Sequence, residues 1–267
     1  MTVAPVFLSV ASCTNIGQKR SLNEDAVLAH MPVFIVADGM GGHDAGDRAS
    51  SIAVEEMSKL GSSPRVEDVR DALTRARYSI DHIVVSSSQR AAGTTVSGIV
   101  MVEQADQPYW LVLNLGDSRT YHVTQGALKQ VSVDHSEAQE MIETGRLDRE
   151  SASQYARRHV ITRVLGARTI ECPEYWLIPV QAPERWMVCS DGLTQELNDW
   201  QIAQILTSEV SAQGAVDALL ERALAAGGRD NISVVIVDVE GPSSYLYEET
   251  IGETNSMWTD TTEEDPA

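Results

Sequence analysis

Short apolar runs rich in β-branched residues recur along this chain, and they limit the folds that are open to it. Five runs predict β-strands, and they span residues 33–36, 96–102, 109–115, 186–189 and 232–239. No helical pattern separates the runs at 96–102 and 109–115 from each other or from a further strand at 119–123. Neighbouring strands with such short connections predict antiparallel meanders.

Helical patterns separate these blocks of strands. Apolar residues recur at three- and four-residue spacing through 66–84 and again through 216–224, where Gly227 and Gly228 end the helix. A polar stretch at 137–158 also predicts helix. We therefore expect an α+β domain in which sheets pack on one another and helices cover their outer faces.

The first residues, MTVAPVFLSVASC, allow two interpretations. Residues 10–13 resemble a lipoprotein cleavage box, but no basic residue precedes Lys19, so the charged start of a signal peptide is missing. The segment therefore predicts a β-strand. No run approaches the roughly eighteen apolar residues of a membrane-spanning helix, and we expect no membrane association.

The three cysteines, Cys13, Cys172 and Cys189, are widely spaced and form no CxxC pair. Such spacing predicts neither a disulfide framework nor a thiolate zinc site, and it favours a cytoplasmic protein.

Charge is distributed unevenly along the 267 residues. The chain has 39 acidic against 20 basic side chains, a formal net charge of -19. This excess argues against general binding to nucleic acids or to anionic membranes, which both require basic residues. Residues 241–267 contain seven acidic and no basic side chains. We expect a folded domain over 1–240 and a disordered acidic tail over 241–267.

Four aspartates stand at the ends of apolar runs: Asp38, Asp117, Asp191 and Asp230. A single aspartate at such a position usually forms a turn or caps a helix. Four on one rim would repel one another and raise one another's pKa, so their arrangement favours bound cations. Ligands made only of oxygen favour Mg²⁺ or Mn²⁺ over Zn²⁺.

A glycine-dense segment, residues 38–46, follows the first of these strands. It is either a tight strand-to-helix connection or a place where a backbone carbonyl approaches a metal closely. It lacks the Lys-Ser/Thr pair of a nucleotide phosphate loop. Within it, His43 is either a surface residue or a proton donor. Arg20 either binds a tetrahedral oxyanion or pairs with Glu24 on the surface.

Eight short motifs, taken together and in order, resemble those of the bacterial metal-dependent PPM family (type 2C) of serine/threonine protein phosphatases. The resemblance covers residues 9–239, and its motifs lie at 17–20 with 23–25, 38–43, 93–95, 116–119, 134–136, 161–166, 190–192 and 228–231. Each motif alone is weak evidence for this family, whereas eight motifs in the family's order are specific evidence. One departure is His159, where the family pattern leads us to expect asparagine.

The resemblance implies a four-layer α-β-β-α sandwich, with two antiparallel sheets face to face, helices on both outer sides, and two Mn²⁺ or Mg²⁺ ions at one edge. Asp38 would bridge both ions, and the carbonyl of Gly39 would be a further ligand. Asp191 and Asp230 would complete the ligands of one ion, and Asp117 with Asp191 would hold a weaker third ion. Glu24 and Asp25 would hold metal-bound waters, and Asn231 would support that water shell.

The implied reaction is hydrolysis of phosphoserine and phosphothreonine in proteins by a hydroxide that bridges the two ions. Arg20 would bind the substrate phosphate, and His43 would protonate the departing oxygen. Residues 137–158 correspond to a flap beside the active site, and we expect a monomer that opposes bacterial Ser/Thr kinases.

Two other hypotheses concern the same domain. A pseudophosphatase would bind phosphoproteins without turnover, but that role tolerates loss of the acidic ligands, which are all present here. A phosphatase dedicated to one regulatory serine in an anti-sigma-factor antagonist usually carries sensor domains, for which this chain has no room.

The tail supports a separate hypothesis. Thr262 and Asp265 have the Thr-x-x-Asp spacing that forkhead-associated domains favour in phosphothreonine peptides. The tail is therefore either a solubilising acidic end or a kinase target that recruits such a reader.

Overall fold

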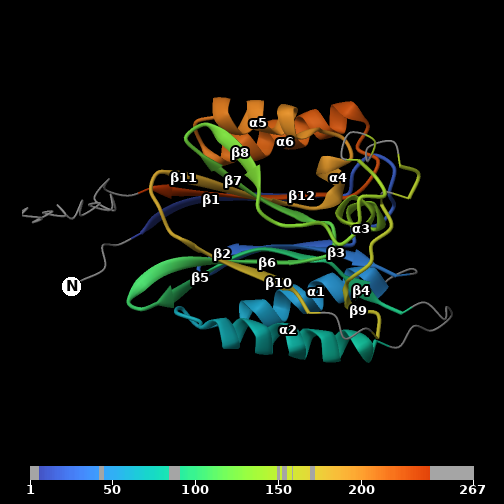
Figure 1. The fold of residues 1–267 in the computed structure, drawn as a ribbon, viewed down its shortest axis with the longest axis horizontal. Helices are drawn as coiled ribbons and strands as arrows, with labels where there is room; N and C mark the ends of the chain where they lie inside the picture. Colours follow the sequence, from blue (N-terminus) through green and yellow to red (C-terminus); the bar gives the residue numbers. More distant parts are fainter. Residues whose placement is uncertain are drawn as a thin grey trace, which may run out of the picture.

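Two β-sheets lie face to face, and helices cover the outer face of each, giving four layers (Figure 1). This computed structural model describes residues 6–41, 45–83, 91–148, 151, 155–157, 159–168 and 172–240. The arrangement is the predicted α-β-β-α sandwich of antiparallel sheets.

The first sheet has five strands in the order β1-β12-β11-β7-β8, and every pairing is antiparallel. Its strands are β1 (Phe7–Asn15), β7 (Arg119–Thr124), β8 (Ala127–Gln130), β11 (Glu184–Cys189) and β12 (Ile232–Glu240). The described part of the opening segment thus contains a strand, as expected. It pairs with the last strand of the chain, so the sheet joins the two ends of the described domain.

The second sheet has the order β10-β6-β5-β3-β4-β9, with β2 paired to β3. Its strands are β2 (Asp25–His30), β3 (Val33–Met40), β4 (Gly93–Thr94), β5 (Val96–Gln104), β6 (Gln107–Leu115), β9 (Leu165–Gly166) and β10 (Glu174–Pro179). The meander predicted over 96–102, 109–115 and 119–123 is confirmed for its first two strands, which form the β5-β6 hairpin of this sheet. It was wrong for the third, because the chain crosses after β6 and β7 pairs with β11 and β8 in the first sheet.

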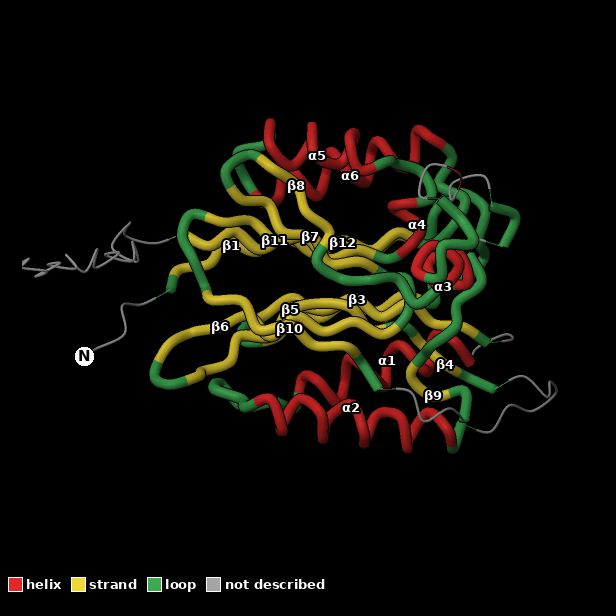
Figure 2. The backbone as a smooth tube through the Cα atoms, viewed as in Figure 1, coloured by secondary structure: helices red, strands yellow, loops and turns green. Residues whose placement is uncertain are grey.

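Helices α1 (Ala45–Ser58) and α2 (Val66–Asp81) cover the second sheet, and α5 (Asp199–Ser208) and α6 (Ala212–Ala226) cover the first (Figure 2). Two short helices, α3 (Glu137–Glu143) and α4 (Asp191–Thr194), lie at one end of the sandwich. No helix in the described ranges is long and apolar enough to cross a bilayer.

Three apolar layers alternate with the elements of secondary structure. One lies between the two sheets and includes Phe34, Trp110 and Trp186, and the other two lie between each sheet and its helices. Strands β3 and β12 are therefore buried on both faces. This is why their sequences are continuous apolar runs and not alternating ones, although both sheets are antiparallel.

The prediction of a helix over 137–158 was wrong in its length. Helix α3 ends at Glu143, and Gly145 follows with a φ of +68°, a left-handed conformation that breaks a helix. Ser136 caps the start of the helix, because its hydroxyl accepts the backbone N–H of Gln139. Residues 155–157 beyond the helix are turn and coil.

The strand registers place the predicted aspartates at one edge of the sandwich. In the second sheet Asp25 is directly opposite Asp38. The first sheet has three paired strands whose residues near one end are Ile232, Cys189 and Arg119. The aspartates lie two residues from these positions: Asp230 from Ile232, Asp191 from Cys189 and Asp117 from Arg119. The pattern of aspartates at strand ends is therefore one cluster in space.

Candidate active site

Five carboxylates make up the acidic rim, the name used here for Asp25, Asp38, Asp117, Asp191 and Asp230. Each carboxylate of the rim affects the pKa of at least one other member: Asp38 does so through a hydrogen bond with Asp191, and the other four do so through their charge. The rim joins the two sheets, because Asp25 and Asp38 belong to strands of one and the other three flank strands of the other.

Burial is the first cause of high pKa values in the rim, and mutual repulsion adds to it. The pKa of Asp38 is well above the usual range, because burial is reinforced by the charges of four other rim carboxylates. Burial and neighbouring charges likewise raise the pKa of Asp117 well above its usual value, and they raise those of Asp25 and Asp191 to about 6. A bound cation would relieve this crowding of negative charge.

Two rim oxygens lack a hydrogen-bond donor among the described residues. Oδ1 of Asp25 and Oδ1 of Asp117 are both buried and accept no hydrogen bond there, although these residues are only 7% and 6% exposed. The other oxygen of Asp25 is fixed, since the Ser190 hydroxyl donates to Oδ2 at 2.8 Å. A buried carboxylate oxygen without a donor is costly, and a metal ion would satisfy it.

Other rim oxygens have protein partners. The Arg20 guanidinium donates to Oδ2 of Asp230 at 2.7 Å, and the Gln195 amide donates to Oδ2 of Asp191 at 2.6 Å. Asp191 is also within hydrogen-bonding reach of Asp38, a contact that needs one shared proton. Within the described part of the chain, no three Asp, Glu, His or Cys side chains already converge as a complete set of metal ligands.

The backbone around Gly39 is packed too tightly for a side chain. Its N–H donates to the carbonyl oxygen of Glu24 at 3.1 Å, and a Cβ at Gly39 would collide with the backbone of Gly46. The Glu24 carbonyl also accepts from the Ser50 hydroxyl, at 2.6 Å. Glycine at this position therefore lets strand β3, the Glu24 loop and the start of α1 meet beside the rim.

Asn231 fastens the loop that carries Arg20 and Glu24. Its side-chain oxygen accepts the Glu24 N–H at 2.9 Å, and its amide donates to the carbonyls of Ile16 and Leu22, both at 3.0 Å. One side chain next to Asp230 thereby holds a segment that lies more than 200 residues earlier in the chain.

Thr94 and Thr95 hold the end of strand β3 from behind. The Asp38 N–H donates to Oγ1 of Thr95 at 3.0 Å, and the Asp38 carbonyl accepts from the Thr94 hydroxyl at the same distance. The Thr95 hydroxyl also shares a hydrogen bond with Ser118, next to Asp117, at 2.7 Å. These two threonines link neighbouring members of the rim.

The structure brings together nine of the ten site residues that the sequence indicated: Arg20, Glu24, Asp25, Asp38, Gly39, Asp117, Asp191, Asp230 and Asn231. The tenth, His43, lies outside the described residues. Sequence reasoning missed the supporting contacts of Ser190, Gln195, Thr94 and Thr95. Three of these residues belong to the quoted motifs, and Gln195 follows Asp191 at the i+4 spacing at which helical side chains meet.

The rim has the chemistry of a site for hard divalent cations. Its metal-binding atoms are all carboxylate oxygens, and two of them are buried without a hydrogen-bond partner in the part of the chain that the structure describes. Burial and mutual repulsion raise the pKa values of these carboxylates. Hard ions such as Mg²⁺ and Mn²⁺ prefer oxygen donors, and they would reverse the sign of the local charge. The residues present thus fit such ions.

Comparisons with a family model and with known proteins agree on one family. A family model described as protein phosphatase 2C matches residues 17–227. Serine/threonine phosphatase Stp of Listeria monocytogenes is 31% identical over 239 residues, which cover 84% of this chain and 93% of that protein. Serine/threonine protein phosphatase PstP of Mycobacterium tuberculosis is 32% identical over 244 residues, which cover 90% of this chain and 46% of that protein.

Solved structures show the same architecture. The serine/threonine phosphatase PstP/Ppp of Mycobacterium tuberculosis superposes with a TM-score of 0.81 at 29% identity, covering 89% of this chain and all of that one. The catalytic domain of PstP in complex with two manganese ions superposes with a TM-score of 0.76 at 28% identity, with the same coverage.

Proposed function

Because the chain belongs to the protein phosphatase 2C family, we propose that its acidic rim is the metal centre of the enzyme and that Arg20 binds the substrate phosphate there. The class of activity follows from the family: the chain is a metal-dependent serine/threonine phosphatase that acts on phosphorylated proteins. The observation that carries the assignment of residues is the set of buried, mutually repelling carboxylates at one edge of the sandwich.

The proposed centre holds two Mn²⁺ or Mg²⁺ ions. Asp38 would contact both, with the Gly39 carbonyl, Asp191 and Asp230 as further ligands and with Glu24 and Asp25 acting through waters. A weaker third ion would lie between Asp117 and Asp191. When bound, the ions supply an activated water and neutralise the phosphoryl oxygens.

The chain's own groups orient the parts around the ions. Ser190 fixes one oxygen of Asp25, and Gln195 fixes one oxygen of Asp191, so each carboxylate presents its other oxygen in a set direction. Asn231 holds the backbone of Glu24. These bonds limit the reorganisation that the rim needs on binding ions.

Arg20 is placed to bind the phosphate. Its side chain is 49% exposed, and its hydrogen bond to Asp230 uses one of five N–H donors. The neighbouring carboxylates keep its pKa above the usual value, so it remains charged. The guanidinium can therefore hold phosphoryl oxygens with its other donors while it stays anchored beside the rim.

Protonation of the departing serine or threonine oxygen is assigned to His43 on the sequence resemblance. The expected test is a loss of the alkaline limb of the pH–rate profile in His43→Gln, because a proton donor is lost as pH rises through its pKa, and the effect should be strongest with alkyl phosphate esters, whose leaving oxygen needs a proton. An unchanged profile would contradict the role.

The central experiment measures hydrolysis of p-nitrophenyl phosphate and of a phosphothreonine peptide with and without Mn²⁺. We expect turnover only with the metal, and a loss of turnover in Asp38→Asn and Asp230→Asn. A folded wild-type chain that binds Mn²⁺ but hydrolyses neither compound would support the pseudophosphatase alternative instead.

The remaining proposals concern the domain bounds, the oligomeric state and the cellular compartment of the enzyme. We propose a catalytic domain over residues 1–240 with a flap over about 137–158, acting as a cytoplasmic monomer. The three cysteines, all described, form no disulfide, which supports a reducing compartment. Size-exclusion chromatography with light scattering tests the monomer, and cell fractionation tests the compartment.

The acidic tail over 241–267 lies outside the described residues. Its Thr262 remains the proposed target of a kinase and of a forkhead-associated reader. Mass spectrometry of the protein from its own cells tests this proposal, and threonines that never carry phosphate would dispose of it.

A further inference from the structure

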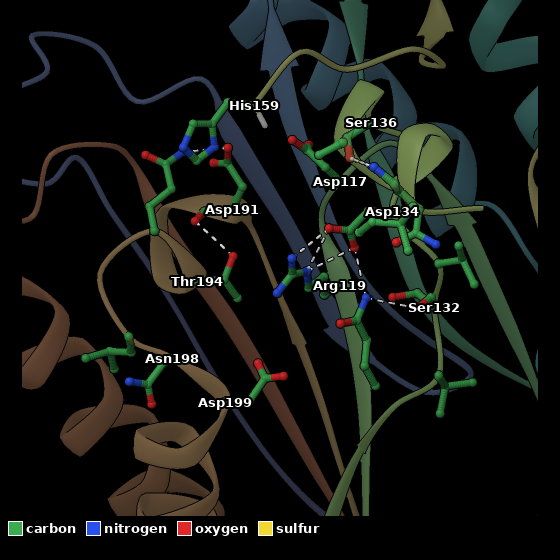
Figure 3. A pocket seen from close by; sticks show the side chains of 18 of the residues that line it. Asp117, Arg119, Ser132, Asp134, Ser136, His159, Asp191, Thr194, Asn198 and Asp199 are labelled. Atoms are coloured by element: carbon green, nitrogen blue, oxygen red, sulfur yellow. Dashed lines mark hydrogen bonds and ion pairs between the residues drawn. The ribbon is translucent and has the colours of Figure 1, made fainter. Parts of the chain in front are cut away.

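A cleft of about 900 Å³ opens from the acidic rim and runs away from it along the molecule. Asp117 and Asp191 lie at the rim end, and Asp199 lies at the opposite end (Figure 3). Strands β7 and β8 with the loop after them form one wall, and α3 and the α4–α5 region form the others. The cleft is far larger than a phosphoryl group, so it has room for the part of a substrate beside the phosphate.

Most of the charge in the cleft is already compensated or assigned. Asp117 and Asp191 belong to the rim, and Oδ1 of Asp117 is buried without a hydrogen-bond partner among the described residues. Asp134 forms two-pronged hydrogen bonds with the Arg119 guanidinium, the shortest of them at 2.7 Å (Figure 3). The carboxylate left over is Asp199, so the far end of the cleft is negative even when the rim holds cations.

Asp199 is exposed but held in one orientation. The hydroxyl of the buried Tyr121 donates to Oδ1 of Asp199 at 2.9 Å, and Oδ2 accepts no hydrogen bond from the described residues. The Arg119 guanidinium contacts Tyr121 in turn, at 3.2 Å. An anchored carboxylate loses little conformational entropy when it binds a partner, which distinguishes it from an ordinary surface aspartate.

Trp200 lies next to Asp199, lines the same cleft and is 69% exposed. An indole so exposed buries little of its apolar surface in the fold, and tryptophan is enriched among residues that dominate binding energies. An aromatic ring and a carboxylate that line one cleft offer a guanidinium or ammonium group two kinds of attraction, since the ring attracts the cation and the carboxylate pairs with it.

We propose that this cleft binds the segment of a phosphoprotein substrate that flanks the phosphorylated residue, and that Asp199 with Trp200 receives a basic side chain of that segment. The proposal rests on the phosphatase function assigned to the rim. It names the substrate class within that function: phosphoserine or phosphothreonine sites with a nearby arginine or lysine.

The test uses phosphothreonine peptides that are identical except for one arginine, which is moved along the sequence on either side of the phosphothreonine or replaced by alanine. Each value of kcat/KM is divided by that for p-nitrophenyl phosphate with the same enzyme, so that effects on the rim cancel. We expect one arginine position to be preferred by about threefold to tenfold, mainly through a lower KM.

Trp200→Ala and Asp199→Asn should each remove most of this preference and leave the alanine peptide little changed. The matched controls are Val210→Ala, which shortens an apolar side chain that is 95% exposed just beyond α5, and Glu221→Gln, which removes an exposed carboxylate of α6. Both controls should retain the preference. Trp200→Ala leaves the Tyr121–Asp199 hydrogen bond intact, so it tests the cleft even if Asp199→Asn folds poorly.

The outcomes distinguish a failure of the function proposed for the rim from a failure of the inference about the cleft. If the wild-type chain with Mn²⁺ does not hydrolyse p-nitrophenyl phosphate, the function proposed for the rim fails. If it hydrolyses that compound but treats all the peptides equally, the phosphatase assignment survives and the inference about the cleft is overturned. A loss of activity in Trp200→Ala that is equal for every peptide overturns it as well.

Discussion

Buried carboxylates occur in two regions of this molecule, and the fold treats them in opposite ways. Glu184, between the two sheets, is 5% exposed and accepts hydrogen bonds from Trp110 at 2.8 Å and from the Gln181 N–H at 3.1 Å, and it also contacts His122 at 2.8 Å. Asp25 and Asp117 in the rim are buried to a similar extent, yet each has an oxygen without such a donor among the described residues.

The difference shows that burial alone does not distinguish a structural carboxylate from a functional one. At Glu184 the protein supplies the donors itself, and the group joins the two sheets because Trp110 and Glu184 belong to different ones. In the rim the protein supplies too few donors, so the missing stabilisation has to come from bound cations. Five predictions test this distinction.

The largest effect is expected for Asp38→Asn. Removing the charge at the centre of the rim should lower kcat/KM for p-nitrophenyl phosphate by a factor on the order of a thousand, about 4 kcal/mol. The metal-free variant should be at least as stable as the wild type, because a repelling charge is gone. Steady-state kinetics and urea titration measure the two effects. Asp71→Asn on the exposed face of α2 is the control, and equal activities in the two variants would remove Asp38 from the centre.

Glu184→Ala should show the converse behaviour. It leaves Trp110 and the Gln181 N–H without their acceptor, so the free energy of unfolding should fall by about 3 kcal/mol. The variant should still respond to Mn²⁺ while folded. Glu184→Gln keeps one acceptor oxygen and should be less damaging. A loss below about 1 kcal/mol in the urea titration of Glu184→Ala would mean that this carboxylate is not structurally important.

Metal binding should stabilise the wild-type chain. At a hundred times its dissociation constant, Mn²⁺ should add about 2.7 kcal/mol to the free energy of unfolding. Glu184→Gln should retain this gain, and Asp38→Asn should lose most of it. Thermal unfolding with and without Mn²⁺ measures the gain. If Mn²⁺ stabilised Asp38→Asn as much as the wild type, the ion would have to bind elsewhere.

The pH dependence of the metal-free chain should report the crowding of the rim. The pKa values of Asp25 and Asp191 are raised from an ordinary value near 3.8 to about 6. The folded state therefore holds more protons than the unfolded state between these values, and its stability should fall as pH rises from about 4 to about 6, by on the order of 2 kcal/mol. Urea titrations across this range measure the slope. A contribution of these two groups that rises with pH would contradict the assignment, and Mn²⁺ should flatten the slope.

The smallest effect is expected for Gln195→Ala, which removes the hydrogen bond to Asp191. Loss of a residue that orients a ligand should weaken Mn²⁺ binding by about tenfold, ~1.4 kcal/mol. The matched control is Gln213→Ala, because Gln213 bonds Asp217 at the same four-residue spacing, at 2.8 Å, on α6. Calorimetric titration with Mn²⁺ should separate the two variants, and identical affinities would leave Gln195 without a role at the rim.

Much of the fold was predictable because its strands carry a local signal. The β-branched runs that became β3, β5, β6, β11 and β12 are buried on most of their length, so their sequences record burial directly. The over-long helix at 137–158 shows the limit of that signal. Its polar residues are compatible with helix, but the conformation of Gly145 ends α3 early.

The clustering of the candidate site residues was predictable from the sequence, but the side chains that support them were not. Aspartates at strand ends are visible in a sequence, and antiparallel pairing brings such ends together. The bond from Ser190 to Asp25 spans 165 positions, and the donors around Glu184 come from different strands and turns. No local pattern encodes partners at such separations, so they were found only in three dimensions.

The hydrogen bonds that Asn231 forms with the loop after β1 determine when the rim can assemble. Among the described strands, β1 pairs with β12 alone, and Asn231 donates to the Ile16 carbonyl across 215 positions. Contacts so distant in sequence form late, because the intervening chain must be made and folded first. A ribosome-bound nascent chain therefore carries Arg20 and Asp38 long before it can assemble the rim. With the rim as the proposed metal centre, we expect no activity during synthesis and its onset only when the last strand is in place.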